Sequence, residues 1–181
     1  MIKLKKESPE VFYSKQKDIV INNKILDFLK KKSKLSPKKI ARLCVHKSKK
    51  DKIHEMFIIF PKNHFCLPHK HPTEESLLVI KGLADIIIFK NNGKIKNIIK
   101  MGDLRTGRIF FHKFKKNTIH LLIVRSKFLY FKEVTKGPFT KKNMSEPKWC
   151  PKNKKQELDF YKDIQLRLKK IKNNSNIFLN K

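Results

Sequence analysis

Eight short apolar runs separated by turn signals constrain the fold of this chain more than any other feature of its sequence. The runs are rich in β-branched and aromatic residues and have the length of strands rather than of helices. Turn signals at residues 91–93, 101–103 and 115–117 fall between them. The pattern predicts a mainly β protein, an antiparallel sandwich or jelly-roll barrel. The predicted strands are 42–46, 56–60, 77–80, 84–89, 95–99, 108–111, 119–124 and 128–134.

Helical patterns flank the strand region on both sides. Asn22 or Asn23 can cap a helix whose apolar side chains share one face and which ends near Ser36, and a short strand is expected at 19–21 before it. Near the C-terminus, Asn153 can cap a second helix. We therefore expect three parts, a strand and helix cover over 1–40, the barrel over 41–140, and a surface linker with a C-terminal helix over 141–181.

Two histidines at alternate positions predict a metal site inside the strand region. In an extended segment His69 and His71 point to the same face, within reach of one ion. Glu75 can join them only if the chain turns at Pro72, because about 13 Å of rise would separate it from His71 on a straight strand. His120 opens a later apolar run, and a neighbouring strand could bring it in as the fourth ligand. The expected metal ligands are thus three imidazoles and one carboxylate.

The segment from His69 to Gly82 reads H-x-H-x3-E-x6-G and resembles the first sequence motif of the cupins, small β-barrels that hold a metal with three histidines and a glutamate. More narrowly, the stretch 41–139 resembles the WbuC family of cupin-fold metalloproteins. The phrases that carry this resemblance are ARLCVHKS at 41–48, PHKH at 68–71, ES at 75–76, MGD at 101–103, VRSK at 124–127 and KGPF at 136–139.

The chain also departs from the cupin pattern. Asn63 stands where a glycine usually precedes the first motif. In the second motif Lys115, Asn117 and Val124 replace the usual proline, glycine and asparagine, so His120 has less support than the other three ligands.

The resemblance implies a jelly-roll (cupin) barrel and a role in surface-polysaccharide, O-antigen or lipopolysaccharide, biosynthesis, with a carbohydrate or nucleotide sugar as the small-molecule partner. The reaction is unassigned. Mixed nitrogen and oxygen ligation suits one divalent transition metal, Fe, Mn, Ni, Zn or Co, and the sequence does not choose among them. Two alternatives stay open, an isomerase, epimerase or oxygenase-type enzyme and a non-catalytic metal-dependent binding module.

Three further residues are candidates for catalytic roles. Arg42 and His46 have the same strand parity and could present a cation and a titratable group to an anionic or sugar-like ligand. His112 lies in an aromatic run and could act as a general acid or base.

The charge of the chain admits two interpretations. Its 45 Lys and Arg against 15 Asp and Glu give a net charge of +30, which can attract nucleic acid or another anionic surface. Only five of these residues are Arg, the residue that bidentate phosphate recognition prefers, and the many lysines among Asn and Ile are typical of AT-rich coding sequence. We favour composition as the cause, so a nucleic-acid binder on a cupin shell is the less favoured alternative.

No apolar run has the length of a membrane span or of a signal peptide, which predicts a cytoplasmic protein. A homodimer is expected only by analogy with other cupins.

Overall fold

The computed structural model describes residues 3–62, 64, 66–138, 140 and 143–178, the last eight of these by their backbone only. Asn63 in the first motif, Phe139 in the KGPF phrase, and residues 141–142 and 179–181 of the expected tail lie outside the described residues. The chain forms two compact units, Met1–Pro147 and Lys148–Lys181, and each is described by itself.

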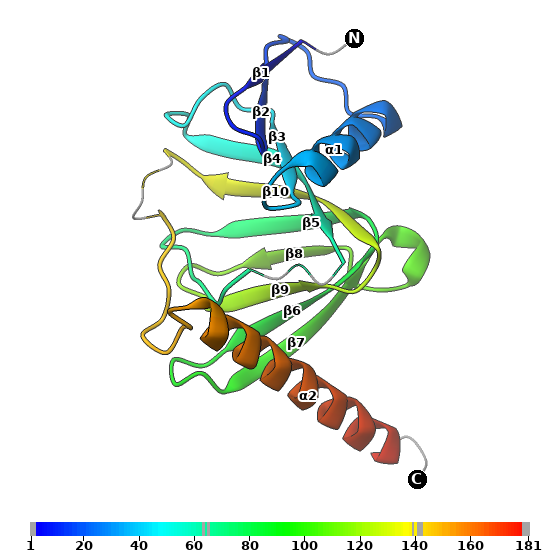
Figure 1. Cartoon of the computed structure of the whole chain (residues 1–181), viewed down its shortest axis with the longest axis vertical. Coiled ribbons are helices and arrows are strands. Elements are labelled where there is room, and N and C mark those ends of the chain that lie inside the picture. Colours follow the sequence, from blue (N-terminus) through cyan, green and yellow to red (C-terminus); the bar gives the residue numbers. More distant parts are fainter. Residues whose placement is uncertain (1–2, 63, 65, 139, 141–142, 179–181) are drawn as a thin grey trace. The chain divides into compact units, whose positions relative to one another are not determined.

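Two β-sheets make up the first unit (Figure 1). The larger sheet has seven strands in the order β1-β2-β3-β4-β10-β5-β8, and the smaller one has three in the order β7-β6-β9. The strands are β1 (Leu4–Lys6), β2 (Val11–Ser14), β3 (Ala41–Cys44), β4 (Ile53–Pro61), β5 (Glu75–Lys81), β6 (Leu83–Phe89), β7 (Ile95–Gly102), β8 (Phe111–Phe114), β9 (His120–Val124) and β10 (Phe128–Lys136).

The strand order is that of a jelly roll. β4, β10, β5 and β8 lie side by side and antiparallel in one sheet. In the other sheet β9, β6 and β7 lie side by side. An isolated bridge between His69 and His120 places the segment before β5 on the free side of β9. The chain therefore passes between the sheets at nearly every connection after β4, as two Greek keys require. The predicted fold class, a mainly β antiparallel jelly roll with an N-terminal and a C-terminal helix, is confirmed.

Strand alternation divides the apolar side chains between an inner and an outer cluster. In β10, Leu129 and Phe131 belong to the cluster between the sheets, whereas Tyr130 belongs to the outer one. The outer cluster contains Leu29, which helix α1 (Asn23–Leu35) buries completely against the larger sheet. Figure 1 shows α1 lying along the strands β3 and β4.

The helix α1 begins and ends where the sequence predicts. The Asn22 side chain accepts a hydrogen bond from the Ile25 amide at 3.4 Å, and Ser36 closes the helix by donating to the Ile40 carbonyl at 2.8 Å. The predicted strand at 19–21 is wrong. These residues belong to no strand, and they lead into the helix, while the N-terminal strands are β1 and β2.

A second shift affects the strand predicted at 108–111, which is found at Phe111–Phe114. A 3-10 helix, η1 (Leu104–Thr106), and the left-handed Gly107 at φ 65 occupy the preceding residues. The shift places His112 and Phe114 on the inner face of the sheet, because Phe114 belongs to the inner cluster and His112 has the same parity.

The second unit consists mainly of helix α2 (Lys154–Phe178). The Asn153 side chain accepts a hydrogen bond from the Gln156 amide at 3.0 Å, so the predicted cap is confirmed. Among the described residues no helix is both long and apolar enough to span a membrane.

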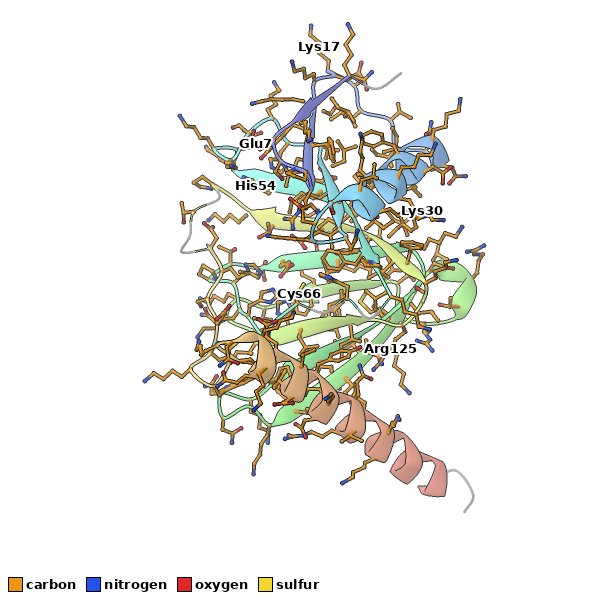
Figure 2. All side chains as sticks on the ribbon, in the orientation of Figure 1. Glu7, Lys17, Lys30, His54, Cys66 and Arg125 are labelled. Carbon is orange, nitrogen blue, oxygen red and sulfur yellow. The ribbon has the colours of Figure 1, made fainter. Side chains whose placement is uncertain are left out.

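Exposed lysines occur on both sheets, on both helices and in loops, so the positive charge is not confined to one element. Lys17, in the loop before α1, is one of these exposed lysines (Figure 2). A nucleic-acid interface predicts a lysine cluster on one face, and this distribution does not favour it.

Gly82 closes β5 in a conformation that other residues rarely adopt, with φ 107. A Cβ atom there would lie 2.6 Å from Ser126 Oγ and closer still to the Phe128 carbonyl oxygen. We expect Gly82→Ala to lower the free energy of unfolding by more than the roughly 1–3 kcal/mol of backbone strain alone. The change is measured by urea denaturation.

Gly107→Ala is the matched control for this variant. Gly107 also has positive φ, at 65, but no atom lies within 4 Å of a Cβ built on it. It should therefore lose only about 1–2 kcal/mol. Equal losses for the two variants would show that the contact with the β10 backbone does not matter.

Candidate metal centre

The sheet pairing brings His69 and His120 together although they are far apart in the sequence. Their backbones form the isolated antiparallel bridge, with the His69 amide donating to the His120 carbonyl at 3.0 Å and the reverse bond at 2.9 Å. Residues opposite each other in such a pair point their side chains to the same face. His120 shares the parity of Leu122 and Val124, which belong to the inner cluster, so the rings lie between the sheets.

The described residues contain one group of histidines arranged as metal ligands, His69, His71 and His120. One ring nitrogen from each of the three lies within 4.8 Å of the others. His120 is buried, with 4% of its side chain exposed, whereas His71 retains 17%. The cluster is therefore reached by solvent from the side of His71.

Each of the three imidazoles is oriented by a hydrogen bond from Nδ1 to a backbone carbonyl. The acceptors are Leu67 at 2.8 Å from His69, Asn143 at 2.6 Å from His71, and Thr118 at 3.0 Å from His120. A carbonyl oxygen only accepts, so each Nδ1 carries the hydrogen and each neutral ring has its lone pair on Nε2. This is the tautomer in which Nε2 binds a metal.

Glu75 completes the cluster with a buried carboxylate. Its Oε2 lies 3.3 Å from His71 Nε2 and 3.5 Å from His120 Nε2, and only 5% of the side chain is exposed. Two donor atoms bound to one ion at about 2.1 Å are about 3.0–3.5 Å apart, which these separations match. The turn at Pro72 that the sequence requires is present, because Glu75 is the first residue of β5.

Burial favours the uncharged forms of His69, His120 and Glu75. It lowers the pKa of His120 to about 3, an effect to which the neighbouring His69 adds, and it also lowers the pKa of His69. Burial raises the pKa of Glu75, and the nearby Glu133 carboxyl raises it further. The imidazoles of His69 and His120 are therefore available as neutral ligands at neutral pH.

Glu133 is a neighbour of the cluster that the sequence analysis missed. It lies on β10 opposite Leu77 of β5, two residues along from the pair Thr135–Glu75, so Glu133 and Glu75 are diagonal neighbours. The two side chains are hydrogen-bonded to each other. The signal was present in the sequence, since Glu133 is an acidic residue at the inward parity of an apolar strand, with Leu129 and Phe131 before it.

The three predicted catalytic residues are at different places in the barrel. His112 packs edge-on against Phe114 at 4.7 Å, and Phe114 stacks on His120 at 4.2 Å, so His112 borders the cluster without joining it. Arg42 is on the inner face of β3 and lies close enough to Glu133 that its charge opposes the rise in pKa that burial causes there.

His46 is not brought into the three-imidazole cluster. Its ring stacks on His54 at 4.1 Å and meets Tyr13 edge-on at 5.4 Å. Figure 2 shows His54 on β4, well apart from Cys66.

Cys66 lies near Glu75 and Glu133. Burial raises the pKa of the Cys66 thiol, and the charges of Glu133 and Glu75 raise it further, to about 12.

Comparison with known families gives a partial match. Residues 21–101, less than half of the chain, match the model of a domain of unknown function, DUF6016. No curated protein sequence matches this chain.

Several solved structures resemble part of the chain. A Shewanella oneidensis protein has 12% identity and a TM-score of 0.49, and the match covers 58% of this chain and 72% of the other. A cupin superfamily protein from Desulfitobacterium hafniense has 11% identity and a TM-score of 0.43, with 54% and 76% covered. Oxalate decarboxylase from Bacillus subtilis has 16% identity and a TM-score of 0.43, with 53% of this chain and 24% of the enzyme covered.

Proposed function

We propose that this chain is a metal-binding protein of the cupin type, in which His69, His71, His120 and Glu75 hold one divalent transition ion. The observation that carries the proposal is the convergence of Nε2 lone pairs on a buried carboxylate oxygen. Glu75 Oε2 has no hydrogen-bond partner among the described residues, although it is buried. His71 Nε2 and His120 Nε2 face it at 3.3 and 3.5 Å.

Without a cation this arrangement is unfavourable. With Nδ1 protonated, each facing imidazole nitrogen is an acceptor. The neutral Glu75 acid has a single proton to donate, so it cannot satisfy His71 and His120 together. Buried acceptors left without a donor lose the hydrogen bonds they would make to water. A divalent ion between the four side chains satisfies all of these lone pairs at once.

Such an ion, when bound, supplies Lewis-acid chemistry to a ligand at a coordination position that the protein leaves open. The chain's own residues orient the donors and limit the access of water. The Nδ1 hydrogen bonds hold the three rings, Glu133 holds Glu75, and Phe114 covers the inner side of His120. His112, which packs against Phe114, is a candidate for moving a proton.

We further propose, from the sequence resemblance to the WbuC family, that the ligand is a carbohydrate or nucleotide sugar of surface-polysaccharide biosynthesis and that the protein acts in the cytoplasm as a homodimer. A non-catalytic binding module has the same metal centre. A panel of nucleotide sugars incubated with the metal-loaded protein separates the two proposals. Tight binding without turnover of any member favours the module.

Elemental analysis of protein purified without added metal tests the metal proposal. We expect about one divalent transition ion per chain, as one set of four ligands holds one ion. Removal of the ion by a chelator should lower the midpoint of thermal unfolding, and restoring it should reverse the change, because an ion that binds only the folded state stabilises it. A protein that contains no metal, and binds none of Fe, Mn, Co, Ni or Zn on titration, contradicts the proposal.

A further inference from the structure

Arg42 differs from the other arginines of the chain in its surroundings. Three of them pair with a nearby aspartate, Arg105 with Asp103 at 3.2 Å, Arg125 with Asp85 at 2.7 Å and Arg167 with Asp163 at 2.8 Å. Arg42 forms no ion pair with a described residue, and its Nε is buried without a hydrogen-bond partner. Because a guanidinium stays charged in proteins, this nitrogen is a buried cationic donor with nothing to donate to.

Strand alternation points Arg42 toward the space between the sheets. Its neighbours Ala41 and Leu43 belong to the outer cluster under α1, whereas Cys44, two residues on, belongs to the inner one. Several interior groups respond to its charge, among them His64 and Glu133. Burial lowers the pKa of His64 to about 4, with a further contribution from Arg42, and Arg42 opposes the rise in pKa that burial causes at Glu133.

Arg42 is therefore next to the metal centre but outside it. Glu133 is hydrogen-bonded to Glu75, so it connects the surroundings of Arg42 to the proposed ligand set. Yet Glu133 and Arg42 are not joined by an ion pair. The guanidinium is close enough to affect the pKa of this carboxyl group, but in the described part of the chain no carboxylate forms an ion pair with it.

We propose that Arg42 binds an oxyanion group of the ligand, a carboxylate or a phosphate, beside the metal centre. The inference rests on the proposed metal site. A guanidinium offers two parallel N–H donors from Nε and one Nη, which match two oxygens of such a group.

The charges in the barrel favour an anion once the metal is bound. A divalent ion and Arg42 carry three positive charges, whereas Glu75 and Glu133 together carry at most two negative ones. Without the ion Arg42 is the single positive charge of this set, so oxyanion binding should depend on metal as well as on Arg42. In a site that excludes water these charges act strongly on one another.

The test is isothermal titration of the full, metal-loaded chain with inorganic phosphate and, separately, with acetate, at constant ionic strength set with chloride. Metal content is first measured in each sample by elemental analysis. We expect binding of one oxyanion per chain, and the tighter of the two probes identifies the phosphoryl or carboxylate source. Arg42→Gln should weaken that binding by about 10- to 100-fold while the metal content stays unchanged.

Two variants accompany Arg42→Gln. Arg42→Lys keeps the charge but loses the paired donors, so an intermediate affinity is expected, and it replaces the glutamine variant if that one fails to fold. Arg108→Gln, which removes an arginine of the segment between η1 and β8, should bind like the unchanged chain. The inference is overturned if Arg42→Gln or Arg42→Lys leaves the oxyanion affinity unaltered. It is also overturned if the metal-loaded protein binds no oxyanion. A chain without metal contradicts the metal proposal instead, and elemental analysis detects this before any titration.

Discussion

His71→Ala and His120→Ala should each yield a folded protein that has lost nearly all of its bound metal. Each change removes one of the four proposed ligand side chains and leaves only three. Loss of a residue behind a ligand already costs about 10–100-fold in metal affinity, so loss of a ligand itself should cost more than about 100-fold. The measurement is metal content by elemental analysis after gel filtration, with circular dichroism to establish that the sheets remain.

His46→Gln is the control for these variants. His46 is a buried imidazole like His120, with 8% exposed against 3%, but it stacks on His54 outside the cluster. It should keep the full metal content. If His120→Ala also keeps it, the ion is held without that ring, and the convergence of His120 on His69 is a feature of packing alone.

Glu133→Ala should weaken metal binding by about 10–100-fold without changing the number of ions bound at saturation. The alanine variant removes the hydrogen bond that holds the Glu75 carboxyl in place, although Glu133 itself does not face the imidazoles. Competition with a metal-binding dye gives the dissociation constant.

Glu133→Gln separates this orienting role from simple removal of charge. The amide of glutamine can still donate a hydrogen bond to Glu75, so its metal affinity should stay close to that of the unchanged chain. If the alanine and glutamine variants weaken binding equally, the charge of Glu133 matters rather than its hydrogen bond. An alanine variant with unaltered affinity shows that Glu75 needs no support.

Short-range patterns in the sequence predict much of the fold. The alternation in His69-Lys70-His71 and the turn at Pro72 depend on a few neighbouring residues, and the structure has both features. The caps at Asn22 and Asn153 are local hydrogen bonds of the same kind. The strand predicted at 19–21 failed because a short apolar run becomes a strand only if another strand pairs with it. Here the run leads into α1 instead.

The position of Glu133 beside Glu75 depends on strand register. A glutamate in an apolar strand is visible in the sequence, but its partner is set by the pairing of β10 with β5. The surroundings of Arg42 and His46 also could not be predicted from the sequence. Their parity is equal, yet Arg42 lies near Glu133 while His46, beyond the end of β3, packs against His54 and Tyr13.

The sequence by itself determined the class of fold, the capping residues of both helices and the identity of four potential metal donors, because each follows from side-chain chemistry within a few residues. Only the tertiary structure decided that His120 lies opposite His69, that Glu75 Oε2 faces the imidazole nitrogens, and that Glu133 and Arg42 are neighbours. These contacts join residues far apart in the chain, and they exist only because closing the two sheets over a shared apolar core fixes the register of every strand.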